Sequence, residues 1–214
     1  MSSRMTVTVD CPRCGKAHPY EVWRSINTVL DPKMRAAVRD LSAFLFTCPS
    51  CGERTYVDYG FLYHQMEDRL MVHYADSEKD FEEACAAHAG DMARDMRGDG
   101  YLVRVVRTQS ELLEKLAIFD RGLDDRAVEV YKVFILASYQ RENPGKGAVD
   151  TLYCSEGGED YVQVLDGARP AAVARMPREA YDTVCREYLG ALPGVREAGP
   201  VIDRQWALET MGLA

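Results

Sequence analysis

The chain has 214 residues, of which 47% are hydrophobic and 28% charged, and this composition excludes disordered and collagen-like classes of protein. The net charge is −8, which disfavours nucleic acid as a partner because duplex DNA is itself a dense line of negative charge. No apolar run reaches the roughly 18 residues that span a membrane, and the first residues do not read as a signal segment. We therefore expect a cytoplasmic protein with no membrane contact.

The first third of the chain has the pattern of a small β-sheet with one helix. Met5, Val7 and Val9 alternate with polar residues, which indicates a half-buried strand that runs into Cys11. A helix is expected to begin at Asp31-Pro32, because Pro is tolerated at the first helical position. Further strand-like runs cover residues 19–25, 43–47, 54–59 and 70–74. We expect residues 1–75 to form a small antiparallel sheet with one helix.

From Ser77 the pattern changes to helices. Capping boxes at Ser77–Asp80 and Thr108–Glu111, and an N-cap at Asp124, each open a segment with helical spacing. The apolar face of the first of these helices is expected to carry Phe81, Ala84, Cys85, His88, Met92 and Met96. The apolar face of the third is expected to carry Ala127, Val128, Tyr131, Phe134 and Ile135.

The Pro- and Gly-rich stretch 143–147 is the clearest break in the chain, and we expect a domain or subdomain boundary there. Beyond it, strand-like runs flank Gly157-Gly158 as a hairpin, and a helix begins at Pro177. The sequence therefore predicts an α+β protein with an N-terminal domain over 1–75, a mainly helical segment over 76–145 and a small α+β segment over 146–214.

A doubled cysteine motif is the strongest signal in the sequence. Cys11–Gly15 reads Cys-Pro-Arg-Cys-Gly, and Cys48–Gly52 reads Cys-Pro-Ser-Cys-Gly. Two such turns supply a tetrahedral shell of four sulfurs, in which Pro stiffens each turn and Gly permits a left-handed backbone. A closed shell leaves no position for an activated water, so we expect a structural zinc ion. Its predicted ligands are Cys11, Cys14, Cys48 and Cys51.

Two alternatives to zinc follow from the same residues. A single Cys-x-x-Cys would also fit a redox dithiol, but two copies with matching Pro and Gly favour a metal. Iron in a rubredoxin-like site uses the same four ligands, so ligand type alone does not separate it from zinc. The odd number of seven cysteines argues against a complete disulfide framework.

Several separated motifs together resemble the CpXC domain family of bacteria and archaea. They are the doubled Cys-Pro-x-Cys-Gly, residues 22–27, Asp31-Pro32, residues 62–64 and residues 70–72. The resemblance covers roughly residues 5–75, and residues 106–108 and 118–125 are similar to the segment that often follows the domain. It implies a metal-binding module without an assigned activity and reinforces the four cysteines as ligands. Gln65 stands where the family pattern leads us to expect Asp.

Other cysteines and histidines have weaker claims to a site. His18 follows the first motif and could ligate the metal or donate a hydrogen bond to a thiolate, although four cysteines already complete the shell. Cys85 and His88 lie on one helical face and could chelate a second metal, but both also belong to the apolar stripe. Cys154 and Cys185 are interpreted as core residues.

The most enzyme-like cluster is His64 beside Tyr63, with Glu67 and Asp68 nearby, because His titrates near neutrality. A packed and hydrogen-bonded His is the plainer interpretation, and no catalytic residue is predicted. Three arginines and three aspartates resemble a solvated or interhelical ion-pair network. They are Arg107, Arg121 and Arg126 with Asp120, Asp124 and Asp125.

The leading hypothesis is a zinc-binding protein in which the metal stiffens a zinc-ribbon-like N-terminal domain and the α+β remainder of the chain contacts a protein partner. An uncharacterised enzyme with a site near His64 is the first alternative. A nucleic-acid-associated regulator is the second, since zinc ribbons often serve in that role, but the acidic charge speaks against it.

Overall fold

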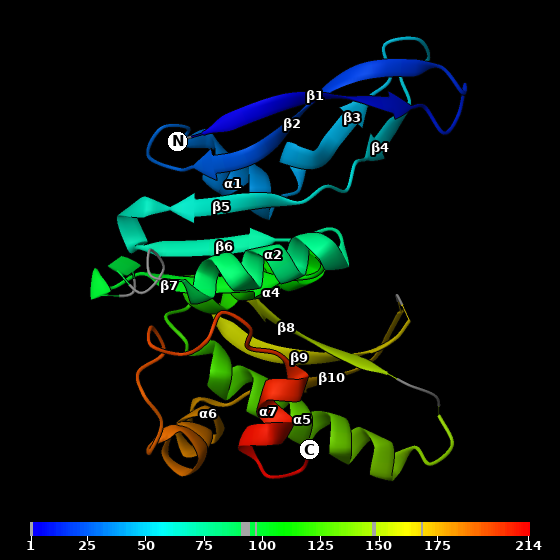
Figure 1. The fold of residues 1–214 in the computed structure, drawn as a ribbon. Helices are drawn as coiled ribbons and strands as arrows, with labels where there is room; N and C mark the ends of the chain where they lie inside the picture. Colours follow the sequence, from blue (N-terminus) through cyan, green and yellow to red (C-terminus); the bar gives the residue numbers. More distant parts are fainter. Residues whose placement is uncertain (1, 91–94, 97, 147–148, 168) are drawn as a thin grey trace. The chain divides into compact units, whose positions relative to one another are not determined.

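The computed structural model describes residues 2–90, 95–96, 98–146, 149–167 and 169–214 (Figure 1). Met92 and Gly147, which take part in the expected helix and break, lie outside these residues. Contacts divide the chain into two compact units, Met1–Leu112 and Leu113–Ala214. The α+β class is confirmed, whereas the three-part division at 75 and 145 stays a prediction.

The first unit is built on a five-stranded sheet in the order β1-β2-β5-β6-β7. Its strands are β1 (Ser3–Asp10), β2 (Ala17–Asn27), β5 (Phe61–Gln65), β6 (Leu70–Tyr74) and β7 (Leu102–Val106). The sheet is mixed and not purely antiparallel as expected. β1 with β2 and β5 with β6 are antiparallel pairs, whereas β2 with β5 and β6 with β7 are parallel. Parallel neighbours need a long crossover connection, and residues 28–60 and 75–101 supply the two crossovers.

The two crossovers carry the helices of the first unit and a second, smaller sheet. They contain α1 (Lys33–Arg39), a 3-10 turn at Ser42–Phe44, the antiparallel pair β3 (Leu45–Thr47) and β4 (Arg54–Tyr56), and α2 (Glu78–Ala89). A further 3-10 turn, Met66–Asp68, joins β5 to β6. Ser77 caps α2 as expected, since its Oγ accepts from the N–H of Asp80 at 3.2 Å.

The core of the first unit contains a cluster of aromatic rings. Phe44 packs against Tyr59 and Phe61 with ring centroids 5.4 and 5.6 Å apart, and Phe61 meets Tyr74 edge-on at 6.3 Å. These rings join the turn before β3 to β5 and β6, so burial of large apolar groups holds the β3–β4 crossover onto the main sheet.

The second unit surrounds one long helix. Its elements are α4 (Gln109–Asp120, which begins in the first unit), α5 (Asp125–Glu142), β8 (Asp150–Glu156), β9 (Glu159–Asp166), β10 (Arg169–Arg175), α6 (Arg178–Val184), a π-turn at Cys185–Leu189 and α7 (Arg204–Thr210). The strands form an antiparallel sheet in the order β10-β9-β8, with the expected Gly157-Gly158 turn between β8 and β9. α5 contacts α6, α7, β8 and β9.

The prediction of the apolar face of α5 is correct for its first residues and wrong for Phe134. Ala127 and Val128 are fully buried, but the Phe134 side chain is 38% exposed. The other positions of the first half of α5 are buried as well, including charged ones. The helix therefore lies inside the second unit over its first turns rather than on the surface.

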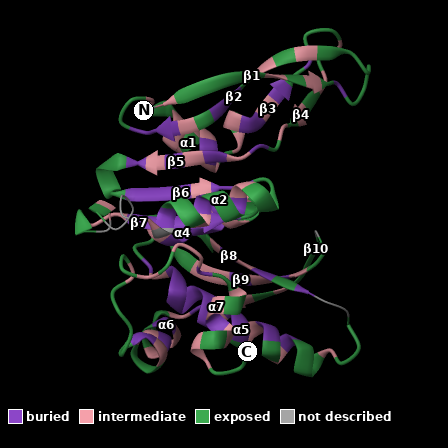
Figure 2. Ribbon diagram, viewed as in Figure 1, coloured by how far each residue is buried: buried purple, intermediate pink, exposed green. Residues whose placement is uncertain are grey.

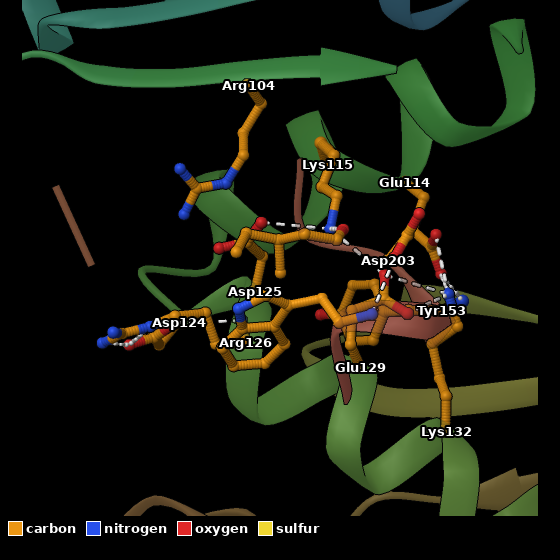
Figure 3. A network of polar contacts seen from close by, with 12 residues as sticks. Arg104, Glu114, Lys115, Asp124, Asp125, Arg126, Glu129, Lys132, Tyr153 and Asp203 are labelled. Carbon is orange, nitrogen blue, oxygen red and sulfur yellow. Dashed lines mark hydrogen bonds and ion pairs between the residues drawn. The ribbon is translucent and has the colours of Figure 1, made fainter. Parts of the chain in front are cut away.

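A network of buried charges links α4 to α5 (Figure 3). The Lys115 Nζ lies 3.0 Å from Asp125 and 3.1 Å from Glu129, and it donates to the Ile202 carbonyl at 2.7 Å. The Lys132 Nζ lies 2.9 Å from a carboxylate oxygen of Glu114 and 3.1 Å from one of Glu129. All five charged side chains are less than 10% exposed.

The charge states in this network follow from burial and proximity. Burial lowers the pKa of Lys132, but Glu114 and Glu129 outweigh it and raise that pKa. Burial alone would raise the pKa of Glu129, but Lys132 and Lys115 hold it below its usual value. Burial raises the pKa of Glu114 despite Lys132. Of the two expected alternatives, a solvated or an interhelical network, Asp125 fits the second, because it is buried and pairs with Lys115 of α4. Arg126 is also buried and donates to the carboxylate of Asp124 at 2.7 Å.

Among the residues that the structure describes, no helix has the length and apolar character needed to cross a membrane.

Candidate metal centre

Both cysteine pairs lie in the turns of β-hairpins. The first pair occupies the β1–β2 turn and the second the β3–β4 turn. The two turns have the same hydrogen bonds. In the first, the Cys11 N–H donates to the Lys16 carbonyl at 3.0 Å and the Gly15 N–H donates to the Cys11 carbonyl at 2.9 Å. In the second, the Cys48 N–H donates to the Glu53 carbonyl at 2.8 Å and the Gly52 N–H donates to the Cys48 carbonyl at 2.9 Å.

The four sulfurs form one compact cluster. They lie within 4.8 Å of one another, with 3.6 Å between the Cys11 and Cys51 sulfurs and 3.7 Å between those of Cys14 and Cys48. A disulfide would need about 2.05 Å, so these are free thiols. A tetrahedral ion with metal–sulfur bonds of about 2.3 Å requires sulfur–sulfur separations of about 3.8 Å. The cluster could therefore hold a metal ion with small adjustments of the sulfur positions.

The thiols of the cluster differ in pKa. The N–H of Cys14 donates to the Cys11 sulfur and lowers the pKa of Cys11 to about 7. At Cys51 the N–H of Glu53 lowers the pKa, but burial and the hydrogen bonds with the other three cysteines outweigh it and raise the value to about 12. Four adjacent thiols cannot all ionise without a cation, so a bound divalent metal would displace the remaining protons.

The cluster sits on a small apolar core of its own. Cys11 and Cys48 are almost fully buried and pack with Phe46. The ring of Tyr20 meets Phe46 edge-on with centroids 5.5 Å apart. This core contains few large side chains, so the sulfur cluster is the main contact between the two turns themselves.

Gly15 and Gly52 are required for conformation rather than for space. Their φ angles are +67° and +74°, and a side chain at either would meet no atom within 4 Å. An L-residue in this left-handed region costs about 1–2 kcal/mol.

We expect Gly52→Ala to destabilise the metal-loaded first unit by about 1 kcal/mol and to weaken zinc retention about fivefold. The measurement is zinc competition with a chromophoric chelator, together with thermal unfolding. Gly199→Ala is the control, because Gly199 also has open space around it but no positive φ. Equal behaviour of the two variants would contradict the assignment.

The structure does not bring the other candidate ligands into a metal site. His18 lies on β2 opposite Val9, 6.3 Å from the Phe46 ring; its Nε2 is buried and has no hydrogen-bond partner among the described residues. His88 packs edge-on against His73 at 5.9 Å. Within the described ranges, the four cysteines are the one group that brings three or more potential ligands together.

The remaining cysteines are half-buried rather than core residues. They are Cys85, Cys154 and Cys185. Burial raises the pKa of each thiol, so none of them has the low pKa of a reactive cysteine. Cys185 packs at the border of the second unit's core.

The acid–base cluster considered around His64 is not assembled. The His64 Nε2 lies 3.1 Å from the Tyr101 hydroxyl. Tyr63 projects to the other face of β5, where its hydroxyl donates to Gln65 at 2.8 Å. Glu67 accepts a hydrogen bond from the Thr28 hydroxyl at 2.6 Å. Arg35 of α1 forms ion pairs with both Glu67 and Asp68.

Gln65 has a structural role in this part of the sheet. Its side chain is buried, and its Oε1 accepts from Arg39 at 3.0 Å and from Tyr63. Its Nε2 donates to Asp68. An amide can accept and donate at once, which explains how a neutral residue serves between a guanidinium and a carboxylate.

Burial lowers the pKa of His64, which leads to a pH dependence of stability. The unfolded chain binds the proton first as pH falls below about 6.5, so the contribution of His64 is present above that pH and is lost as pH falls toward the lowered folded pKa. We expect His64→Gln to reduce the loss of stability between pH 7 and pH 5.5, by at most about 1.4 kcal/mol per pH unit. Denaturant unfolding at matched pH values checks this, and identical slopes in both proteins would contradict it.

The fold and the cluster define an α+β protein with a four-cysteine site that could hold a metal ion. A family model described as CpXC protein matches residues 9–132, more than half of the chain, so the chain belongs to the CpXC family. The match extends beyond residues 5–75 and includes both cysteine turns and the buried charges of α4 and α5. Searches of curated proteins and of solved structures found no match.

Proposed function

We propose that this CpXC protein binds one zinc ion through Cys11, Cys14, Cys48 and Cys51, and that the zinc has a structural role. The observation that carries the proposal is the convergence of two equivalent hairpin turns on one sulfur cluster. Thiolates are soft ligands, and a tetrahedral shell of four of them suits zinc or iron. Because protein ligands fill all four positions, the metal would stabilise the fold and would not activate water.

We further propose that the zinc-stiffened first unit contacts a protein partner. Val29 and Leu30 are 54% and 59% exposed, on a turn whose N–H groups donate to the side chain of Asn27. Met66 is 48% exposed, and its sulfur lies 3.8 Å from the Asn27 amide nitrogen. Exposed apolar side chains on a rigid turn support a role in protein contact.

The charges of the first unit favour a protein over a nucleic acid. Arg13 pairs with Glu53 at 3.6 Å, and Arg35 pairs with Glu67 at 3.3 Å. Cations neutralised within the chain have less to offer to phosphates, and the net charge of −8 adds repulsion.

The test is capture from the native cell with the wild-type chain as bait and with Cys48→Ser as the metal-deficient bait. The proposal predicts a protein that the wild-type chain retains after nuclease treatment and that Cys48→Ser does not retain. Cys85→Ser is the control, since Cys85 lies in the same unit outside the cluster. Recovery of nucleic acid alone, or equal capture by all three baits, would overturn the interaction role.

A further inference from the structure

The outer side of β1 is open. β1 is at the edge of the five-stranded sheet, and β2 is its one neighbour among the described residues. The two strands pair along the whole length of β1. Most residues of β1 are exposed, as the colouring of this strand in Figure 2 shows. β1 therefore presents a row of backbone groups that can pair with another strand.

The pairing with β2 determines which groups face outward. Pro19 stands opposite Thr8, and because Pro has no N–H, this pair is not hydrogen-bonded. The next pair beyond the strand, Cys11 and Lys16, is hydrogen-bonded at 3.0 Å. Since the two kinds of pair alternate in an antiparallel ladder, the even-numbered residues of β1 direct their N–H and C=O groups away from β2. They are Arg4, Thr6, Thr8 and Asp10.

The middle of this edge lacks the devices that usually protect an exposed strand, and its charges lie at the two ends, Arg4 and Asp10. Met5–Val9 contains no Pro, no charge and no bulge; the register irregularity falls earlier, at Ser3 and Arg4. The exposed edge strand of the second unit, β10, differs in this respect. It contains Pro170 within the strand and a register shift after that residue.

β1 has a positive charge near its start and a negative charge at its end, so two antiparallel copies of the strand would bring opposite charges together. Arg4 is near the start of the strand. Its guanidinium lies over the Trp23 ring at 4.0 Å, 3.5 Å from Glu21 and 3.9 Å from Asp31, and the side chain is still 49% exposed. Asp10 is at the end of the strand, is exposed and forms no ion pair with any described residue. An antiparallel copy centred on Val7 would place Arg4 of each strand opposite Asp10 of the other. Shifting the register by two residues in either direction loses both ion pairs.

The same register satisfies the backbone and the other side chains. It opposes even-numbered residues to even-numbered ones, so outward N–H and C=O groups meet as hydrogen-bonded pairs. Thr6 faces Thr8 of the copy, and Met5 faces Val9 of the copy on the other side of the sheet. Hydroxyl, apolar and opposite-charge pairs are each favourable cross-strand neighbours.

We infer that β1 pairs with β1 of a second copy of this chain, antiparallel and centred on Val7, to form a two-fold dimer with one continuous sheet. This deepens the proposed interaction role by naming one partner, and it does not depend on which metal the cysteines hold. A single strand edge buries less surface than a standard interface, so the dimer is reversible.

The first test uses sedimentation equilibrium of the full chain from about 1 to about 200 µM, with any tag at the C-terminal end so that β1 is unmodified. The wild-type chain is expected to be in monomer–dimer equilibrium. Thr8→Pro removes an outward N–H and no bond to β2, so it is expected to be monomeric with unchanged metal content. Thr8→Val keeps the N–H and is expected to dimerise.

The second test exploits the charge pattern. Arg4→Glu and Asp10→Lys each place like charges across the seam, and each is expected to dimerise about tenfold more weakly than the wild-type chain. A 1:1 mixture of the two variants restores both ion pairs in the heterodimer, and its affinity is expected to return to about the wild-type value. A folding defect in either variant could not produce this rescue.

A monomeric wild-type chain over the whole range, a Thr8→Pro variant that dimerises like Thr8→Val, or a mixture no tighter than the single variants would overturn the inference. Failure of this kind in a chain that retains its metal would overturn the dimer and leave the proposed zinc site standing. A chain that dimerises as expected but holds no metal would overturn the zinc site and leave the dimer standing.

Discussion

Cys48→Ser is expected to lose bound zinc and to unfold the two hairpins that carry the cysteines. Serine oxygen is a poor substitute for a thiolate, and the three remaining sulfurs leave the shell incomplete. Zinc binding in small modules is worth about 10–16 kcal/mol, comparable with the whole stability of a domain. The small apolar core around Phe46 cannot replace a contribution of that size.

The unfolding is expected to be local. β5 and β6 belong to the aromatic core of Phe44, Phe61 and Tyr74, which does not depend on the cluster. Hydrogen exchange should therefore show faster exchange in β1, β3 and β4 of the variant and little change in β5 and β6. Cys85→Ser is the matched control and should retain zinc. Full protection of β1 and β3 in a zinc-free Cys48→Ser protein would contradict a structural role for the metal.

Lys132→Met is expected to destabilise the second unit by about 3–5 kcal/mol, the usual cost of breaking a buried ion pair. Lys132 is the cation that lies between Glu114 and Glu129, both of which are buried (Figure 3). Among the described residues, its removal leaves Glu114 with one hydrogen bond, from the Tyr153 N–H, and leaves Glu129 to share Lys115 with Asp125. An unfolding titration of the full chain measures the loss.

Lys79→Met is the control for the same chemical change at the surface. Lys79 pairs with Glu83 at 3.7 Å, and both side chains are well exposed. Such pairs contribute about 0.5 kcal/mol or less. Adding Glu114→Leu to Lys132→Met should recover part of the lost stability, because it removes the uncompensated carboxylate. A loss below about 1 kcal/mol in Lys132→Met would show that water reaches the network.

The cluster of four cysteines could be predicted from the sequence because its determinants are local. Each turn contains two cysteines, a proline and a glycine within five positions, and the duplication of that pattern indicated that two distant turns come together. The register and parallel pairing of β2 with β5 could not be predicted in the same way. They depend on how the crossover over residues 28–60 packs against the sheet.

The buried charges were missed for a different reason. Asp125, Glu129 and Lys132 recur at helical spacing, and such a row usually lies on a solvated face. The available signal was in α4, where Glu114 and Lys115 interrupt an apolar run between Leu112 and Leu116. Charges inside such a run, followed by charges of both signs on the next helix, are compatible with a buried network.

Metal analysis of freshly purified wild-type protein tests the central claim most directly. Elemental analysis with X-ray absorption at the zinc edge should find about one zinc per chain, bound by sulfur alone at about 2.3 Å. Protein that is folded but free of transition metal, iron in place of zinc, or nitrogen or oxygen in the shell would contradict the structural zinc site of Cys11, Cys14, Cys48 and Cys51.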